Sequence, residues 1–499
     1  DGAYRFMFGT TTDGGTVQGE DAEHPGPAKR DDLTGGAITD DMSPVVKVVP
    51  QYPPDTTADA VDIRDYRFAD ESAAAGQKEG DVPVIGVADT TSNGAGQGIT
   101  LNFPEQRNYN VNFATDEVLT QLGNSYNAQF YQPLSGATSL NPGLSGMVSM
   151  AASDLFEDHK IIGGFRLALD LNNNDYLLRY ANLKRRLNKE FIFQRQAIQG
   201  VSNVGLVKLH SHSAVARITW PFSELACVRG SLLYRNDRYV VQSTDGVSLR
   251  QPNYSDHMTG TRLEYVYDSS IPRGLNLWTG WKLKFFGEYY IQPDNRDTDM
   301  QVVGMDLRHS LKVHRDIIWV TRLAGSSSFG SRKVLFYMGG VDNWFFPKVD
   351  ESIPVDQSQN YTYQSSGVPL RGFYYNARNG SSFALLNTEL RIPLFKYLIN
   401  RPIRSDLIQN FQIIGFGDMG TAWTGADPYS DDNTFNQQVI ERNPLTITIK
   451  NLREPILGSY GFGLRTRVLG YFIRGDWAWG VDDGVILDPV FHFSLGLDI

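Results

Sequence analysis

Two short stretches bring together side chains that can bind metals. His210 and His212 in "HSHS" are two positions apart, so on a strand they would share one face, but no third ligand accompanies them. In "DLNNND", residues 170–175, the oxygen-bearing side chains are spaced as in a calcium loop, without that loop's glycine and distal glutamate. Because Asn and Asp also favour tight turns, we predict a hairpin turn there and no metal site in the chain.

A third candidate is Arg371, which stands in the loop-like stretch "VPLRGFYYNARNG", residues 368–380. The arginine side chain is planar, permanently charged and shaped to bind a carboxylate through two hydrogen bonds. Ordering a flexible loop costs about 1–2 kcal/mol per residue, so a loop held in one conformation needs an anchor. The stretch predicts either a structural ion pair or an unrelated surface charge, and in neither case catalysis.

Composition excludes several other kinds of site. Cys227 is the single cysteine, so neither an intrachain disulfide nor a thiolate metal site can form. The net charge of -10 argues against a nucleic-acid binder, and the one short basic cluster, Lys184-Arg185-Arg186, is too small to change that. The chain has no Gly-x-Ser-x-Gly elbow, phosphate loop or thiol motif. We therefore predict no catalytic residue and no cofactor.

The elements that must position these residues are strands. From about residue 108 to residue 499, apolar and polar residues alternate in segments separated by turn residues. In "LLNTELRIPL", for example, one face carries Leu386, Leu390 and Ile392 and the other carries Asn387, Glu389 and Arg391. Such alternation fits a soluble sandwich or a membrane barrel with a polar lumen. No apolar run is long enough for a transmembrane helix.

The spacing of the turns favours the barrel. We count about 16 strands, with connections that tend to alternate between short and long, as in outer-membrane barrels. Short turns are predicted at "PFSELA", "SSIPRGLN", "KVHRD" and "VLGY", and long loops at residues 200–211, 242–256, 339–382 and 424–458. The predicted fold is all-β: a transmembrane antiparallel β-barrel of about 16 strands over residues 108–499, with an extended N-terminal arm.

The arm comprises residues 1–107, which are acidic and rich in Gly and Pro with few apolar islands. We expect a periplasmic arm or linker. Its first residues, "DGAYRFMF", resemble the last strand of a propeller blade, and the alternative is an isolated strand or a disordered end. No repeats of about 75 residues with amphipathic helices precede the barrel.

Four ordered stretches resemble the outer-membrane insertase and translocase superfamily, which includes the central barrel-assembly subunit, two-partner-secretion transporters and the bacterial surface antigens. "FYMGGVDNW" resembles the end of the family's eleventh strand, "LRGF" its sixth external loop, "ALLNTELRIPL" its twelfth strand and "FGDMGTAW" its thirteenth. "SYGFGLRTRVLGYFIRGDWAW" and "FHFSLGLDI" resemble the last three strands. The missing repeats imply that the family's polypeptide-transport-associated domains are absent from this chain.

The resemblance implies a loop latch, in which the sixth loop folds into the lumen and Arg371 binds Asp418 on the thirteenth strand. Gly372 would pass close to the wall, Phe373 would pack against it and Glu389 would join the network. The motif of the thirteenth strand also includes Phe416 and Gly420.

The resemblance also implies a function and a place in the cell. We expect a bacterial outer-membrane protein, not an enzyme, that assists insertion or export of proteins. Its expected partners are outer-membrane lipids, other envelope proteins or lipoproteins, and client polypeptides. Two alternatives stay open: a non-transporting structural barrel in a larger envelope complex, and a barrel hydrolase whose catalytic residues come from several strand tips.

Overall fold

The computed structural model describes residues 112–123, 131–136, 145–168, 174–202, 205–243, 246, 248–367, 369–399, 401–433, 435–442, 445–450 and 453–497. The predicted arm, residues 1–107, and most of "DLNNND" lie outside these residues. The strands are β1 (Phe113–Gly123), β2 (Gln132–Pro133), β3 (Ser145–Asp154), β4 (His159–Ala168), β5 (Asn174–Asn182), β6 (Asn188–Ser202), β7 (Gly205–Pro221), β8 (Ala226–Val241), β9 (Tyr254–Asp268), β10 (Ile271–Gly274), β11 (Leu277–Gln292), β12 (Asn295–His314), β13 (Ile317–Phe329), β14 (Lys333–Met338), β15 (Tyr361–Ser366), β16 (Arg378–Gly380), β17 (Ser382–Ile392), β18 (Gln412–Trp423), β19 (Gln437–Arg442), β20 (Leu445–Lys450), β21 (Leu457–Val468), β22 (Tyr471–Asp482), β23 (Val485–Ile486) and β24 (Val490–Leu495). The helices are α3 (Leu394–Leu398), α4 (Asp406–Gln409) and the 3-10 helix η3 (Ser248–Arg250).

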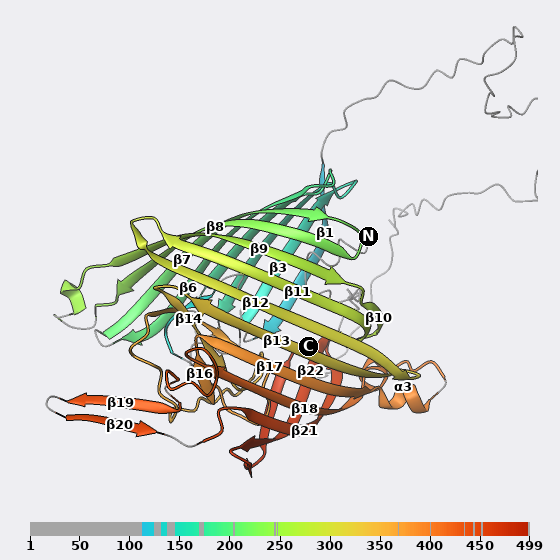
Figure 1. Ribbon diagram of the computed structural model, residues 1–499. Helices are drawn as coiled ribbons and strands as arrows, with labels where there is room; N and C mark the ends of the chain where they lie inside the picture. The colour runs from blue at the N-terminus through green and yellow to red at the C-terminus, as the bar shows by residue number, and fades with distance from the viewer. Residues whose placement is uncertain are drawn as a thin grey trace, which may run out of the picture. The chain divides into compact units, whose positions relative to one another are not determined.

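An antiparallel series of long strands forms the wall of the molecule (Figure 1). Each strand pairs with the next along the series β1, β3, β4, β5, β6, β7, β8, β9, β11, β12, β13, β17, β18, β21, β22, β24. These are sixteen strands, so the predicted all-β antiparallel fold and its strand number are confirmed. Strands β1 and β24 are the two ends of the series.

The two ends of the wall differ in their connections. At one end, which we call the short-turn end, residues 155–158, 183–187, 222–225, 315–316 and 469–470 join neighbouring strands. The opposite, long-loop end carries the two longest connections, residues 330–381 and 424–456. The hairpin of β19 and β20 belongs to the second of these and extends away from the wall (Figure 1).

The strands turn their apolar side chains outward and their charges inward. On β8, Leu232 is 63% exposed, whereas Arg235 and Asp237 are buried. On β17, Leu386 and Leu390 are exposed, whereas Asn387, Glu389 and Arg391 are buried on the other face. A soluble sandwich would bury the apolar face, so this geometry excludes the sandwich alternative and leaves the barrel with a polar lumen.

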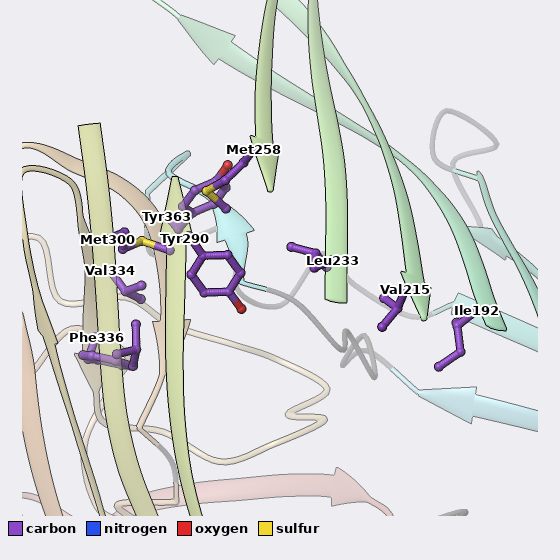
Figure 2. Close-up of a cluster of buried hydrophobic side chains, with 10 residues drawn as sticks. Ile192, Val215, Leu233, Met258, Tyr290, Met300, Val334, Phe336 and Tyr363 are labelled. Carbon is purple, nitrogen blue, oxygen red and sulfur yellow. The ribbon is translucent and has the colours of Figure 1, made fainter. Parts of the chain in front are cut away.

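A second sheet lies inside this wall. Strands β16, β14, β15 and β2 form a four-stranded sheet in that order, which we call the inner sheet. Val334, Phe336 and Tyr363 of the inner sheet lie beside Met258 of β9, Tyr290 of β11 and Met300 of β12, and the same buried cluster continues to Leu233, Val215 and Ile192 on β8, β7 and β6 (Figure 2). Met338, farther along β14, packs against Leu385 of β17 and Ala422 of β18. The inner sheet therefore bridges two walls of the lumen.

Two expectations about the strands are wrong. "FYMGG" does not end the eleventh strand, because β13 ends at Phe329 and Phe336 to Met338 belong to β14 of the inner sheet. Residues 200–211 do not form a long loop, because β6 and β7 extend through them in continuous register as far as Ser202 and Gly205. Turn residues such as Gly200 and Ser211 are accommodated within these long strands, because cross-strand pairing continues on both sides of them.

Candidate functional site

The site is built around Arg371, which lies in the connection between β15 and β16 and is almost fully buried. Its Nε and Nη2 donate hydrogen bonds to the two carboxylate oxygens of Asp418, each at 2.7 Å. Its Nη1 donates to Oε1 of Glu389 at 2.6 Å. The guanidinium carbon lies 3.7 Å from the centre of the Phe416 ring. Arg371 thus has charged partners at its edge and an aromatic ring on one face.

Neighbouring strands deliver these partners to one place in the lumen. Asp418 and Phe416 alternate with outward residues on β18, and Glu389 lies on β17. The register pairs Asn387 with Asp418 and Glu389 with Phe416, so all four side chains project from one patch of the inner wall. The period of two residues along each strand is what gathers them.

Two further side chains, one charged and one neutral, complete the hydrogen bonds of this group. Oε2 of Glu389 accepts hydrogen bonds from Arg391, at 2.9 Å from Nε and 2.7 Å from Nη2. Nδ2 of Asn387 donates to Oδ1 of Asp418 at 2.8 Å. Two arginines therefore face two carboxylates. We call Arg371, Asp418, Glu389, Arg391, Asn387 and Phe416 the Arg371 cluster.

Beside Arg371 the loop backbone comes very close to the barrel wall. Gly372 has φ of 82°, and a Cβ atom there would lie 2.8 Å from the backbone nitrogen of Gly480 on β22. The Gly372 N–H donates to Nε2 of His492 on β24 at 3.0 Å. A side chain at position 372 would disrupt both the conformation and this approach.

The remaining predicted residues lie on either side of this contact. Phe373 is buried in a cluster with Met338, Leu370 and Leu457. A Cβ at Gly420 would lie 3.1 Å from the Ala384 backbone oxygen, 3.2 Å from the Leu385 side chain and 3.4 Å from the Met338 side chain, so Gly420 leaves room for β17 and the inner sheet.

The candidate metal ligands lie on strands other than those of the Arg371 cluster. His210 and His212 lie on β7, and Nδ1 of His210 is 3.4 Å from Nη2 of Arg195. Asp175 accepts a hydrogen bond from Nε of Arg166 at 2.6 Å. In the part of the chain that the structure describes, no group of three or more His, Cys, Asp or Glu side chains could hold a metal ion.

The site includes residues that the sequence did not single out. Asn387 and Arg391 were recognised only as members of a polar strand face, and the same alternation carried the information that they face the lumen. His492 had a weaker signal, a polar residue between Phe491 and Phe493 on the last strand. Gly372, which it contacts, lies 120 residues earlier in the sequence, and no local pattern encodes a contact over that separation.

A second buried arginine, Arg378, holds the other end of the same connection. Its Nη2 donates to Oδ1 of Asp482 at 2.7 Å, and its guanidinium carbon lies 3.8 Å from the centre of the Phe435 ring. Its Nε and Nη2 also donate to the backbone oxygens of Pro455 and Glu454. The loop is therefore fixed at two points, Arg371 and Arg378.

No helix among the described residues is long and apolar enough to cross a membrane. No protein-family model matches the chain, and no curated protein matches it significantly.

Several solved structures are similar to the chain. BamA from Haemophilus ducreyi lacking POTRA domains 1–3 has a TM-score of 0.47 and 12% identity, covering 78% of this chain and 75% of that one. CdiB from Acinetobacter baumannii has a TM-score of 0.42 and 14% identity, covering 79% and 60%. CdiB from Escherichia coli has a TM-score of 0.41 and 11% identity, covering 76% and 61%. The chain thus spans less than two thirds of either CdiB chain. Its own strand registers define a series of sixteen antiparallel strands.

Proposed function

We propose that the protein is a bacterial outer-membrane barrel that assists the insertion or export of other proteins at that membrane. The placement in a membrane is supported by the outward apolar side chains of the wall. Leu263 is 63% exposed on β9, Phe191 is 55% exposed on β6 and Trp319 is 50% exposed on β13. Large apolar side chains exposed on strands spread along the wall match a lipid-facing surface, because a protein surface in water rarely exposes so many of them.

The observation that carries the proposal is the edge of the last strand. No ladder of backbone hydrogen bonds joins β24 to β1 within the described residues. Instead, Trp344 forms an isolated antiparallel bridge with Ser494, and the Phe345 N–H donates to the Phe493 oxygen at 2.8 Å. A short segment of the chain's own loop, which we call the strap (residues 342–346), thus pairs with β24.

The edge of β24 could exchange the strap for another extended segment. Backbone groups on a strand edge pair with any extended chain, because hydrogen bonds of the main chain do not depend on side-chain identity. The strap offers β24 far fewer bonds than a full strand would. A strand of a client protein could therefore displace it and add to the barrel wall.

The strap is also connected to the Arg371 cluster. The ring of Trp344 lies 4.4 Å from that of His492, centre to centre, and His492 accepts the Gly372 N–H. Nη2 of Arg474 donates to the Asp342 oxygen at 2.7 Å. We infer that the loop latch holds the strap on β24, so that release of the loop would free the edge.

The test is a disulfide that locks the strap. Trp344→Cys with Ser494→Cys joins two bridged positions, where cross-strand Cα distances of about 4.5–5.5 Å suit a disulfide. Cys227 is replaced with Ser in all variants. In cells depleted of the native protein, we expect the oxidised variant to leave outer-membrane and surface proteins depleted, and reductant to restore them.

The matched control is Gln437→Cys with Lys450→Cys, which staples the paired ends of β19 and β20. It should support normal protein levels in either redox state. If depletion of the native protein left the outer-membrane profile unchanged, or if the locked strap had no effect, the proposed function would be wrong.

One observation favours a second candidate, a structural barrel that transports nothing. The inner sheet bridges both walls of the lumen and is held by two buried arginines. An unchanged protein profile after depletion, together with loss of a co-purifying envelope complex, would support this candidate.

A further inference from the structure

The turn between β5 and β6 concentrates positive charge at the short-turn end. Lys184, Arg185 and Arg186 are all exposed there, and Lys189 follows on the outward face of β6. Within the described part of the chain, none of these four has a carboxylate oxygen within 4.0 Å. By contrast, the arginines of the lumen pair with carboxylates, as Arg179 and Arg217 do with Glu190. The turn therefore carries charge that the protein itself does not neutralise.

One of these side chains is held in a fixed position. Nε and Nη2 of Arg186 both donate to the backbone oxygen of Pro221 at 3.2 Å. The guanidinium carbon lies 4.7 Å from the centre of the Trp220 ring, which is 43% exposed on β7. This cation–π contact and the two hydrogen bonds place Arg186 beside an outward-facing tryptophan. Tryptophan in that position is typical of the boundary between lipid tails and headgroups.

The height of the charges along the barrel agrees with this boundary. Lys189 lies two residues before Phe191, the first large apolar side chain on the outward face of β6. At about 3.3 Å per residue, Lys189 stands about 7 Å from Phe191 along β6. It also lies opposite Ile218, which is 53% exposed. Lys189 and Arg186 thus lie at the margin of the apolar surface, beside Ile218 and Trp220, from where long basic side chains can extend to lipid phosphates.

An apolar groove lies directly above them on the same strands. It has a volume of about 460 Å³, and its outward lining includes Leu178, Phe191, Phe193, Ala214, Ala216 and Leu232. The registers pair Ala216 with Phe191 on one side and Leu232 on the other, and Ala214 with Phe193 and Tyr234. The small alanines of β7 form the floor, and the large side chains of β6 and β8 form the two walls.

We propose that this surface binds one anionic phospholipid of the leaflet at the short-turn end. Its phosphate would bind Arg186 and the neighbouring lysines, since guanidinium and ammonium groups donate charge-assisted hydrogen bonds to phosphate oxygens. One acyl chain would run along β7 over Ala216 and Ala214. The basic turn joins β5 to β6, and the groove above it is formed by β5, β6, β7 and β8. Because the headgroup site and the chain groove are adjacent, they fit one bound lipid better than they fit non-specific attraction of the basic residues to the membrane surface.

The test measures binding of phosphatidylglycerol to the full chain in a zwitterionic detergent by native mass spectrometry. The charge variant is Lys184→Gln, Arg185→Gln and Arg186→Gln, and we expect its apparent affinity to fall about tenfold or more, because each basic residue contributes to binding an anionic headgroup. The matched control, Lys312→Gln with Arg401→Gln and Arg404→Gln, removes three exposed charges elsewhere at the same end, one on β12 and two in the connection between β17 and β18. It should bind as the wild type does.

A second variant tests the groove with the charges intact. Ala216→Trp fills the floor with a side chain that faces outward, so the barrel should still fold, as its heat-dependent gel mobility would verify. We expect weaker binding of phosphatidylglycerol with long chains and unchanged binding of a short-chain analogue. Equal affinity in the wild type and the charge variant would overturn the proposal, as would equal affinity in the charge variant and its control. Unchanged long-chain binding in Ala216→Trp would overturn the single-lipid site. None of these measurements involves client proteins, so they are separate from the test of function.

Discussion

At the scale of residues, Arg371 is the member of its cluster whose loss should matter most. Arg371→Ala would leave Glu389 paired with Arg391 and Asp418 buried with the neutral amide of Asn387, at a cost of about 3–5 kcal/mol in the free energy of unfolding. Arg371→Lys should recover only part of this, because an ammonium group cannot reach both carboxylates with a planar fork. The temperature at which the folded gel mobility disappears measures the effect.

Protease cleavage within residues 339–381 supplies a second readout for the same variant. If Arg371 anchors the loop, Arg371→Ala should be cut faster there than wild type, while the exposed Arg401→Ala should not. A variant with unaltered melting and cleavage would show that the ion pair does not hold the loop.

Gly372 can be compared with Gly470 to separate two costs of adding a side chain: backbone strain at a positive φ, and collision with the backbone of β22. Gly372→Ala and Gly470→Ala both place alanine at a positive φ, 82° and 84°, and each costs on the order of 1–3 kcal/mol by strain alone. Only position 372 has backbone within 3.0 Å of the added Cβ, whereas Gly470 has nothing within 4 Å. Gly372→Ala should therefore lower the melting temperature more. Equal effects would mean that the loop can move away from β22 without cost.

At the scale of elements, the sequence predicted what depends on local alternation. The twelfth and thirteenth strands, β17 and β18, lie where "ALLNTELRIPL" and "FGDMGTAW" indicated. The inner sheet was not predicted, because "FYMGG" has the composition of a wall strand and its partners are distant: β14 pairs in parallel with β15 and antiparallel with β16. Which sheet an apolar strand joins is decided by such contacts, not by its own pattern.

The helices α3 and α4 illustrate the same limit. They lie in the connection between β17 and β18, residues 393–411, for which the sequence predicted no helix. Both are about one turn long, and isolated helices of that length have little stability of their own. Thr466 Oγ1 donates to the Leu407 oxygen at 2.7 Å, so contact with β21 helps to hold α4. That contact lies 59 residues away in the chain and is invisible in the local sequence.

At the scale of the whole molecule, the barrel encloses its own loop. Tyr363 of the inner sheet donates to Asp237 on β8 at 3.3 Å and lies under the guanidinium of Arg235. On the other side, the Arg371 cluster fixes the connection that follows β15 to β17 and β18. The inner sheet is therefore attached to β8 and to β17 and β18 by separate polar contacts, and Phe383 of β17 packs against both of its apolar clusters. Release of one set of polar contacts should loosen the inner sheet without removing it.

This arrangement predicts how the barrel conducts ions in a planar bilayer. The wild type should show little steady conductance, since the inner sheet fills the lumen. The variant Val334→Ser, Phe336→Ser and Tyr363→Ser weakens the apolar packing on β9 to β12 and on Phe383 of β17, and it should open briefly. Adding Arg371→Ala should produce long openings, because the ion pairs to β17 and β18 are then lost as well. Phe346→Ser changes a residue of the same loop that is 70% exposed, and it should conduct like the wild type. A large steady conductance in the wild type would show that the inner sheet does not close the pore.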